Sequence, residues 1–177
     1  MHANLFGDFV KGKNLDMYVP KVRKGIVLHR KIDSYIGQHP EVRKLLLHLS
    51  PSLPKVSGIA IDIFFDHFLA LHWNQFHSTE LNEFLESFYH HKINESHYPD
   101  ELFLQTLFRL KKGKWISEYG NLDGVEGVCI GVSRRISFPN ALMNGRMVLE
   151  SNYGLIEEIF HSFMNDAIGS LSDEIKK

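Results

Sequence analysis

Residues 59–73 read I-A-I-D-I-F-F-D-H-F-L-A-L-H-W and decide the fold. Apolar side chains occur on nearly every side of a helix with this sequence, and a helix of that kind is normally buried. The flanking residues extend the pattern, so we predict a central helix over residues 56–74. The segments on either side have to supply the helices that cover it.

Helical periodicity continues in both directions from this central segment. Apolar residues recur at mixed three- and four-residue spacing, which is the signature of a helix with one buried face. Proline residues interrupt the pattern at 40, 51 and 54, and Pro40 is well placed in the first turn of a new helix. The predicted helices cover residues 21–36, 41–49, 80–89, 99–110, 115–119, 122–133 and 142–168.

Some boundaries of these helices follow from single residues. Ser78 and Thr79 are predicted to cap the helix that ends near Tyr89. Residues 122–133 contain three glycines, so a β-strand is the alternative there, and the last helix is expected to bend near Gly154. No linker or repeat divides the chain. We predict one all-α domain over residues 1–177, a single-domain helical bundle.

Composition excludes several classes of protein. With 177 residues, 44% of them hydrophobic and 23% charged, the chain has the make-up of an ordinary globular domain. The net charge of -1 does not favour a nucleic-acid partner. Cys129 is the single cysteine, which excludes an internal disulfide and fits a reducing cytoplasm. No apolar run reaches the roughly 18 residues of a membrane span, so we expect a cytoplasmic protein without a membrane partner.

Charge is unevenly distributed along the chain. Residues 1–48 contain nine lysines and arginines against four acidic residues, which leaves a net charge of +5. Such a surplus can attract an acidic protein or a phosphate group. The alternative is a solvated surface with no binding role.

Two pairs of residues with metal-ligand chemistry are spaced four apart. His29 and Asp33 form one pair, and Asp62 and Asp66 form the other. Four-residue spacing places both side chains on one helical face. Imidazole and carboxylate groups suit Mn²⁺, Fe²⁺, Zn²⁺ or Mg²⁺. His67, next to Asp66, is a further candidate ligand.

Ionisable groups among large apolar residues need a partner charge, a hydrogen-bond network or a metal. We therefore predict that the two helices face each other and form a mixed imidazole and carboxylate metal site. The alternatives are a His–Asp pair one turn apart and a buried network with arginine or histidine. Asp8 is a third acid between apolar neighbours. His72 is expected to play a supporting or structural part, and the other histidines, His161 among them, show no ligand spacing.

Arginines near these residues could bind phosphate. Arg134 and Arg135 are adjacent, and guanidinium groups match phosphate oxygens in bidentate fashion. Arg30 follows His29 directly. A surface position without a ligand is the alternative for all three.

Four blocks of sequence, in this order, resemble the bacterial acyl carrier protein phosphodiesterases. The first three are N-L-F-G-D-F-V-K-G at 4–12, G-I-V-L-H-R-K-I-D-S-Y-I-G-Q-H-P-E-V at 25–42 and I-D-I-F-F-D-H-F-L-A-L-H-W at 61–73. The fourth is G-V-S-R-R at 131–135. The blocks span most of residues 4–135, and the helical remainder also fits.

The resemblance implies an HD-domain-like all-α fold, because the family is linked to the HD-domain metal-dependent phosphohydrolases. It implies removal of the 4′-phosphopantetheine arm from holo acyl carrier protein, with Mn²⁺ as the favoured cofactor and Mg²⁺ or Fe²⁺ as alternatives. Members usually begin with an N-F-L-A-H segment ahead of the first block, so we expect that segment and its histidine to be missing here. The family's recurrent acids and histidines correspond to Asp8, His29, Asp33, Asp66 and His67.

We predict that these five residues are metal ligands, because their chemistry and spacing suit that role. Arg30, Arg134 and Arg135 would stabilise the phosphate, and Asp62 would protonate the leaving serine oxygen. The basic residues 1–48 would attract the acidic carrier protein. Two other functions stay open: a phosphohydrolase acting on a small nucleotide, and a non-catalytic helical module that binds an acidic protein.

Overall fold

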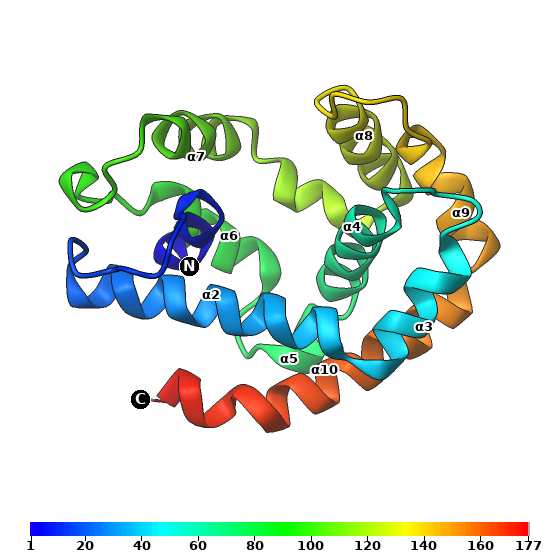
Figure 1. Cartoon of the computed structure of the whole chain (residues 1–177), viewed down its shortest axis with the longest axis horizontal. Coiled ribbons are helices and arrows are strands. Elements are labelled where there is room, and N and C mark those ends of the chain that lie inside the picture. The colour runs from blue at the N-terminus through cyan, green and yellow to red at the C-terminus, as the bar shows by residue number, and fades with distance from the viewer. Residues whose placement is uncertain (177) are drawn as a thin grey trace.

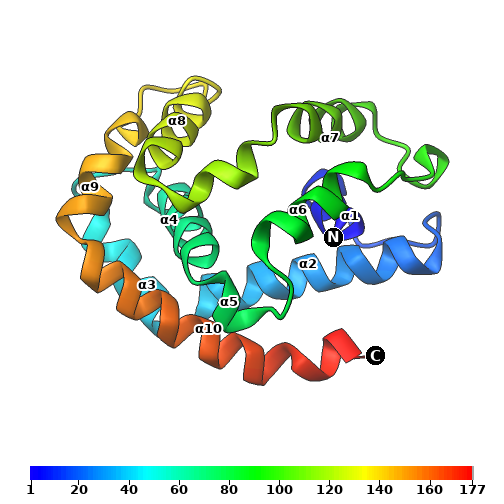
Figure 2. The same ribbon diagram turned by 180° about the vertical axis from the view of Figure 1, so that it is seen from behind.

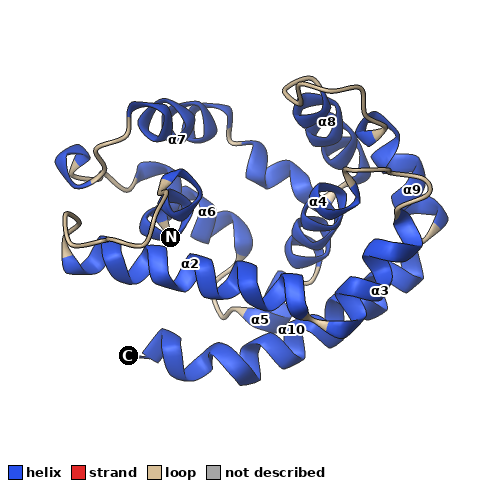
Figure 3. Cartoon of the chain, viewed as in Figure 1, coloured by secondary structure: helices blue, strands red, loops and turns tan. Residues whose placement is uncertain are grey.

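A computed structural model describes residues 1–176, with side chains described through Leu171, and every regular element in that range is a helix (Figures 1 and 3). The prediction of an all-α fold is confirmed. The elements are α1 (His2–Leu5), η1 (Phe6–Phe9), α2 (Pro20–Gln38), α3 (Pro40–Leu49), α4 (Ser57–Leu71), α5 (Trp73–Phe76), α6 (Leu81–His90), η2 (Glu95–His97), α7 (Glu101–Gly113), η3 (Trp115–Gly120), α8 (Leu122–Ser133), η4 (Leu142–Asn144), α9 (Gly145–Ser151) and α10 (Tyr153–Lys176).

Local signals in the sequence explain most of these boundaries. Asp100 caps α7 by accepting a hydrogen bond from the Phe103 backbone N–H at 2.8 Å. Asn121 caps α8 in the same way, so the strand alternative for residues 122–133 is wrong. The predicted capping by Ser78 and Thr79 is also wrong, because α6 begins after Glu80 with no side-chain cap. The predicted last helix is divided at Asn152 into α9 and α10.

The buried apolar side chains form two separate clusters, here called the large core and the small core. The large core lies among α3, α4, α8, α9 and α10, and the small core lies among α1, η1, α6, α7 and the first half of α2. Figure 2 shows the two groups of helices side by side, with α2 running along both. The largest fully buried side chains are Phe64, Phe68, Phe160, Ile61, Leu45, Leu49, Leu53, Leu142 and Leu149 in the large core, and Phe6, Phe103 and Ile26 in the small core.

Helix α2 passes from one core to the other. Val22 and Ile26 are buried in the small core, whereas Tyr35 and Ile36 pack against the large core. The turns between these positions carry His29 and Asp33, which face a cleft between the cores. The fold therefore places the first predicted ligand pair where the apolar packing changes from one core to the other.

Helix α4 is buried on most of its surface but not on all of it. Ile61, Phe64 and Phe65 are buried in the large core. Asp62 and Asp66 are exposed and face the same cleft as His29. The expectation that these carboxylates lie within the apolar core is wrong in this respect, because the cleft gives their side of the helix access to water. No helix in the described part of the chain combines the length and the apolar character needed to span a bilayer.

Candidate active site

The cleft lies between η1, α2, α4 and α10 and has a volume of about 780 Å³. That volume is in the usual range for small-molecule sites. Four acids and one histidine line one part of it, and apolar side chains line the rest. No lysine or arginine is present among its described lining residues, which are Asn4, Leu5, Asp8, His29, Ile32, Asp33, Ile36, Asp62, Phe65, Asp66, Leu69, Phe160, Phe163, Met164, Ala167, Ile168 and Leu171.

Three of the predicted ligands converge at the mouth of this cleft. His29 Nε2 lies 3.3 Å from Asp8 Oδ1 and 3.0 Å from Asp33 Oδ2. The imidazole is largely buried, with 13% of its side chain exposed, whereas the two carboxylates are open to solvent. One ligand atom from each of the three residues lies within 4.8 Å of the others. His29 and Asp33 share a helical face, as their spacing predicts, and His29 also contacts Asp8.

Two features of the local sequence bring Asp8 to His29. A Cβ atom on Gly7 would lie 2.3 Å from His29 Cδ2, so only glycine allows η1 to approach the imidazole this closely. Arg30 Nη2 donates hydrogen bonds to the carbonyl oxygens of Val10 at 3.0 Å and Gly12 at 2.7 Å. Helix α2 therefore holds the segment after Asp8 in place.

Asp62 and Asp66 add two more carboxylates on the α4 side. Although Asp62 reaches the solvent in the cleft, the protein around its carboxylate removes part of the hydration and raises its pKa to about 6, with further contributions from the negative charges of Asp33 and Asp8. The same effect, reinforced by Asp62, raises the pKa of Asp66 to about 7. These acids repel one another, and no described cation of the protein lines the cleft to balance them.

The donor set of the cleft fits a divalent cation. Carboxylate oxygens and one imidazole suit Mn²⁺, Mg²⁺ or Fe²⁺. Asp8, His29 and Asp33 already have the proximity that a shared ion requires, and Asp62 and Asp66 line the same space. A cation would also balance the acidic charge.

His67 is not brought into the cleft, although its neighbour Asp66 is. Its Nδ1 lies 2.7 Å from the Tyr119 carbonyl oxygen and its Nε2 lies 2.9 Å from the Tyr153 hydroxyl. The ring is buried, and burial lowers the pKa of His67. Consecutive residues point about 100° apart around a helix, so Asp66 faces the cleft while His67 faces η3 and α10. The predicted ligand role of His67 needs correction: both ring nitrogens have other partners.

The predicted phosphate-binding arginines also lie outside the lining of the cleft. Arg135 is exposed at the end of α8 and lies over the Trp115 ring, 5.9 Å from its centroid. Arg134 is exposed beside it. Arg30 is bound to the carbonyl groups of Val10 and Gly12. The structure therefore supports a positioning role for Arg30 and places Arg134 and Arg135 outside the lining of the cleft.

Sequence reasoning missed two features near this site. Asn4 lines the cleft next to Asp8, and the N-L-F-G-D motif contained that signal. His72, Glu157 and His161 form a second cluster of potential ligands. The four-residue spacing of Glu157 and His161 was visible in the sequence, but their approach to His72 across the fold was not.

Carboxylates and an imidazole that meet in an open cleft are groups that hydrolases use to transfer protons and to bind metal ions. A family model described as acyl carrier protein phosphodiesterase matches residues 1–167. The chain belongs to this family, whose name denotes phosphodiester hydrolases.

Curated relatives agree with the family match. They include the acyl carrier protein phosphodiesterases of Salmonella agona, Salmonella newport and Salmonella enteritidis. Each is 31% identical over 166 residues, which covers 92% of this chain and 85% of the relative. No solved structure matches the fold, so its predicted likeness to HD-domain proteins stays a prediction.

Proposed function

We propose that this protein hydrolyses the phosphodiester between 4′-phosphopantetheine and a serine of holo acyl carrier protein, which gives apo acyl carrier protein. The observation that carries the proposal is the convergence of Asp8, His29 and Asp33 in one cleft with Asp62 and Asp66. Membership of the phosphodiesterase family supports the reaction class. The single, buried Cys129 is compatible with the cytoplasm, where we place the enzyme.

Hydrolysis of a phosphodiester requires an activated water and compensation of the charge on the phosphate oxygens. A bound divalent cation supplies both, through a lowered water pKa and polarisation of the phosphate. We propose Mn²⁺, with Mg²⁺ or Fe²⁺ as alternatives, and Asp8, His29 and Asp33 as its ligands. Asp66 completes the acidic surface of the cleft on the α4 side and is a further candidate ligand.

The other cleft residues would handle the proton and the substrate. Asp62 would donate a proton to the leaving serine oxygen, because it lines the same space and its raised pKa leaves part of it protonated near neutral pH. Apolar side chains from α10, Phe163 and Met164 among them, line the rest of the cleft. They offer a surface for the pantetheine arm.

The basic surplus belongs to the same part of the sequence as three residues of the acidic cleft. Residues 1–48 carry the net charge of +5 and also contribute Asp8, His29 and Asp33. We propose that these basic residues attract an acidic carrier protein to the side of the molecule that carries Asp8, His29 and Asp33. The cleft would act on the phosphodiester, whereas the basic surface would attract the acidic body of the carrier protein.

The test is conversion of holo to apo acyl carrier protein, followed by intact-protein mass spectrometry with and without Mn²⁺. We expect turnover by the wild type, loss of turnover after chelation, and recovery when Mn²⁺ is returned. His29→Gln and Asp33→Asn should abolish turnover, and Asp62→Asn should lower it by about 100-fold or more.

The matched control is His90→Gln. His90 and Glu86 form another His–carboxylate pair one turn apart, 3.4 Å from each other, on the exposed surface of α6. This variant should retain full activity. Hydrolysis of a small nucleotide without action on the carrier protein would overturn the proposal. Tight binding of the carrier protein without turnover would instead favour a non-catalytic module.

A further inference from the structure

We propose that His72, Glu157 and His161 form a second divalent-metal site, which prefers Zn²⁺ and joins the end of α4 to α10. None of these residues lines the cleft described above. Phe160 lies between the two sites, because its ring contacts the rings of both His72 and His161 and also lines the cleft. The second site is therefore a separate centre.

The backbone holds the three residues close together. Glu157 and His161 are one helical turn apart on α10, so their side chains share a face. His72 is the C-cap residue directly after α4. Its Nε2 lies 2.6 Å from Glu157 Oε1, and its ring centroid lies 4.7 Å from that of His161. One ligand atom from each residue lies within 4.8 Å of the other two.

The surroundings suit a bound ion that keeps access to water. His72 has 19% of its side chain exposed and Glu157 has 31%. Phe68 stacks parallel to His72 at 6.3 Å, and Phe76 contacts His161 at 6.5 Å. Aromatic rings therefore cover part of the cluster, while its exposed part leaves room for a water as a further ligand.

The chemistry of the three donors separates this site from the cleft. Two imidazoles and one carboxylate are the ligand set of several zinc sites, whereas a cleft with one imidazole and four carboxylates favours harder ions. Gln75 Nε2 lies 3.4 Å from His72 Nδ1. When His72 Nε2 binds the ion, Nδ1 carries the proton, and rotation of the Gln75 amide by about 180° would place Oε1 there to accept the hydrogen bond and orient the ring. Zinc bonds of about 2.0–2.1 Å in a tetrahedron put ligand atoms roughly 3.3 Å apart. Binding would therefore replace the short contact between His72 and Glu157.

The simpler interpretation is a hydrogen-bonded His72–Glu157 pair with the His161 ring packed against it. That interpretation requires no ion and gives His161 no polar role. A metal site instead requires all three side chains. The two interpretations therefore differ in the effect of replacing His161 alone.

The experiment uses the full chain with the cleft disabled by Asp8→Asn and Asp33→Asn, so that ions in the cleft do not contribute. Zinc stoichiometry is measured by calorimetric titration and elemental analysis, and Co²⁺ serves as a spectroscopic probe. We expect one Zn²⁺ per chain and visible Co²⁺ absorption bands. Adding His161→Gln or Glu157→Gln should remove both signals, with a loss of affinity beyond the roughly 10–100-fold that loss of a supporting hydrogen bond causes.

Two controls make the outcome decisive. His90→Gln in the same background should leave zinc binding unchanged, and far-UV circular dichroism should show that every variant retains its helices. A rise in the midpoint of thermal unfolding on addition of Zn²⁺ should disappear with the His161 and Glu157 variants. Absence of zinc binding in the cleft-disabled chain, or unchanged binding after His161→Gln, would overturn the proposal. Neither result depends on hydrolytic activity, so neither affects the proposed function.

Discussion

Residue 7 has to be a glycine, because the imidazole of His29 occupies the space that a side chain at this position would need. The ring atoms Cδ2 and Cγ of His29, and its Cβ, all lie within 2.6 Å of the position that a Cβ on residue 7 would take. No rotation about a Cα–Cβ bond relieves this overlap, because Cβ itself is the atom in conflict. The approach of Asp8 to His29 therefore depends on the residue before it.

Gly7→Ala should separate Asp8 from His29. We expect a loss of stability of about 1–3 kcal/mol, as for other overpacked sites, and at least a tenfold weaker affinity for Mn²⁺. Denaturant unfolding and calorimetric titration measure the two effects. Gly37→Ala is the control, because a Cβ at residue 37 of α2 meets nothing within 4 Å. It should stabilise the helix by about 0.5–1 kcal/mol, and equal behaviour of the two variants would contradict this account.

His2 is a buried histidine without a hydrogen-bond partner at Nε2. Its ring stacks on Phe88 at 4.6 Å and on His91 at 5.2 Å. Burial, followed by the charges of Lys111 and His91, lowers the pKa of His2 to about 4 from an ordinary 6.5. The unfolded chain therefore binds a proton at this residue between pH 6.5 and 4 that the folded chain does not bind.

This difference makes stability fall as the pH falls from about 6.5 towards 4. His2→Phe keeps the aromatic stacking and removes the titration. At pH 5 we expect the variant to gain stability relative to the wild type by on the order of 2 kcal/mol more than at pH 7.5. Unfolding by urea at the two pH values measures the effect. An identical pH dependence for both proteins would show that His2 is hydrated in the folded state.

Single residues also mark the limit of prediction from the sequence. The four-residue spacings correctly grouped His29 with Asp33 and Asp62 with Asp66, because spacing along one helix fixes the shared face. His67 was grouped with Asp66 by adjacency, although adjacent residues of a helix face different directions. The pairing of His72 with Glu157 spans 85 residues. Only the tertiary fold determines such a contact.

Helix α2 carries the proposed ligands His29 and Asp33 and also fixes the element opposite them. Arg30 binds two carbonyl groups of the loop after η1, while His29 contacts Asp8 in η1 itself. Arg30, which was predicted to bind phosphate, thus forms a structural tie between α2 and the loop after η1. Because both acceptors are backbone atoms, the tie does not depend on the side chains of the loop.

Arg30→Met should loosen the segment that carries Asp8. Loss of two charged hydrogen bonds at a partly buried position should cost about 1–3 kcal/mol, and hydrogen exchange of the backbone amides near Val10 should accelerate. Arg43→Met on α3 is the matched control, because Arg43 is exposed and the change removes the same charge. An Arg30 variant with unchanged exchange near Val10 would refute the positioning role.

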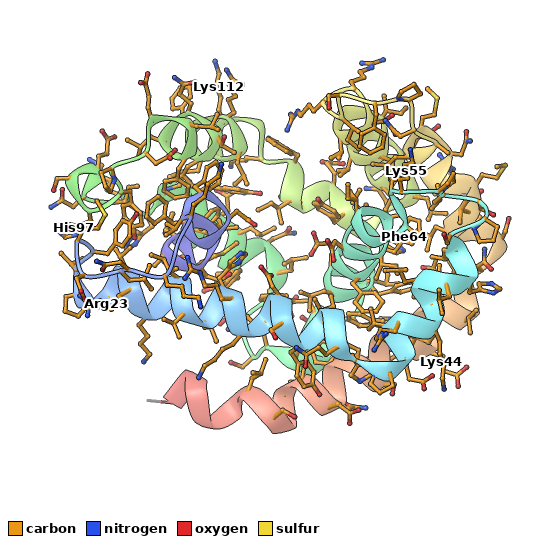
Figure 4. All side chains as sticks on the ribbon, in the orientation of Figure 1. Arg23, Lys44, Lys55, Phe64, His97 and Lys112 are labelled. Carbon is orange, nitrogen blue, oxygen red and sulfur yellow. The ribbon has the colours of Figure 1, made fainter. Side chains whose placement is uncertain are left out.

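Prediction was most successful at the level of whole helices. Residues 21–36 and 59–73 carry apolar side chains at helical spacing over a long stretch. The helices α2 and α4 form in these segments, as predicted. The start of α6 was harder to predict, because no side chain caps this helix. Figure 4 shows the side chains on both sides of α4, with the buried Phe64 labelled.

At the scale of the whole molecule, the basic surplus of residues 1–48 should act on the rate of encounter with an acidic protein. Raising the salt concentration from about 0.1 M to 1 M shortens the Debye length from about 10 Å to 3 Å. We expect kcat/KM for holo acyl carrier protein to fall about tenfold or more, with kcat unchanged. Hydrolysis of a small synthetic phosphodiester is the comparison and should respond much less. Equal salt responses of the two substrates would exclude electrostatic attraction of the carrier protein.

The path of α2 along both cores has a consequence for motion. Asp8 belongs to an element of the small core, Asp62 and Asp66 belong to an element of the large core, and His29 and Asp33 lie on the helix between them. A hinge rotation of one core relative to the other would change the span from Asp8 to Asp66. A compact ligand bound to both sides of the cleft would therefore favour one relative orientation of the two halves and couple their unfolding.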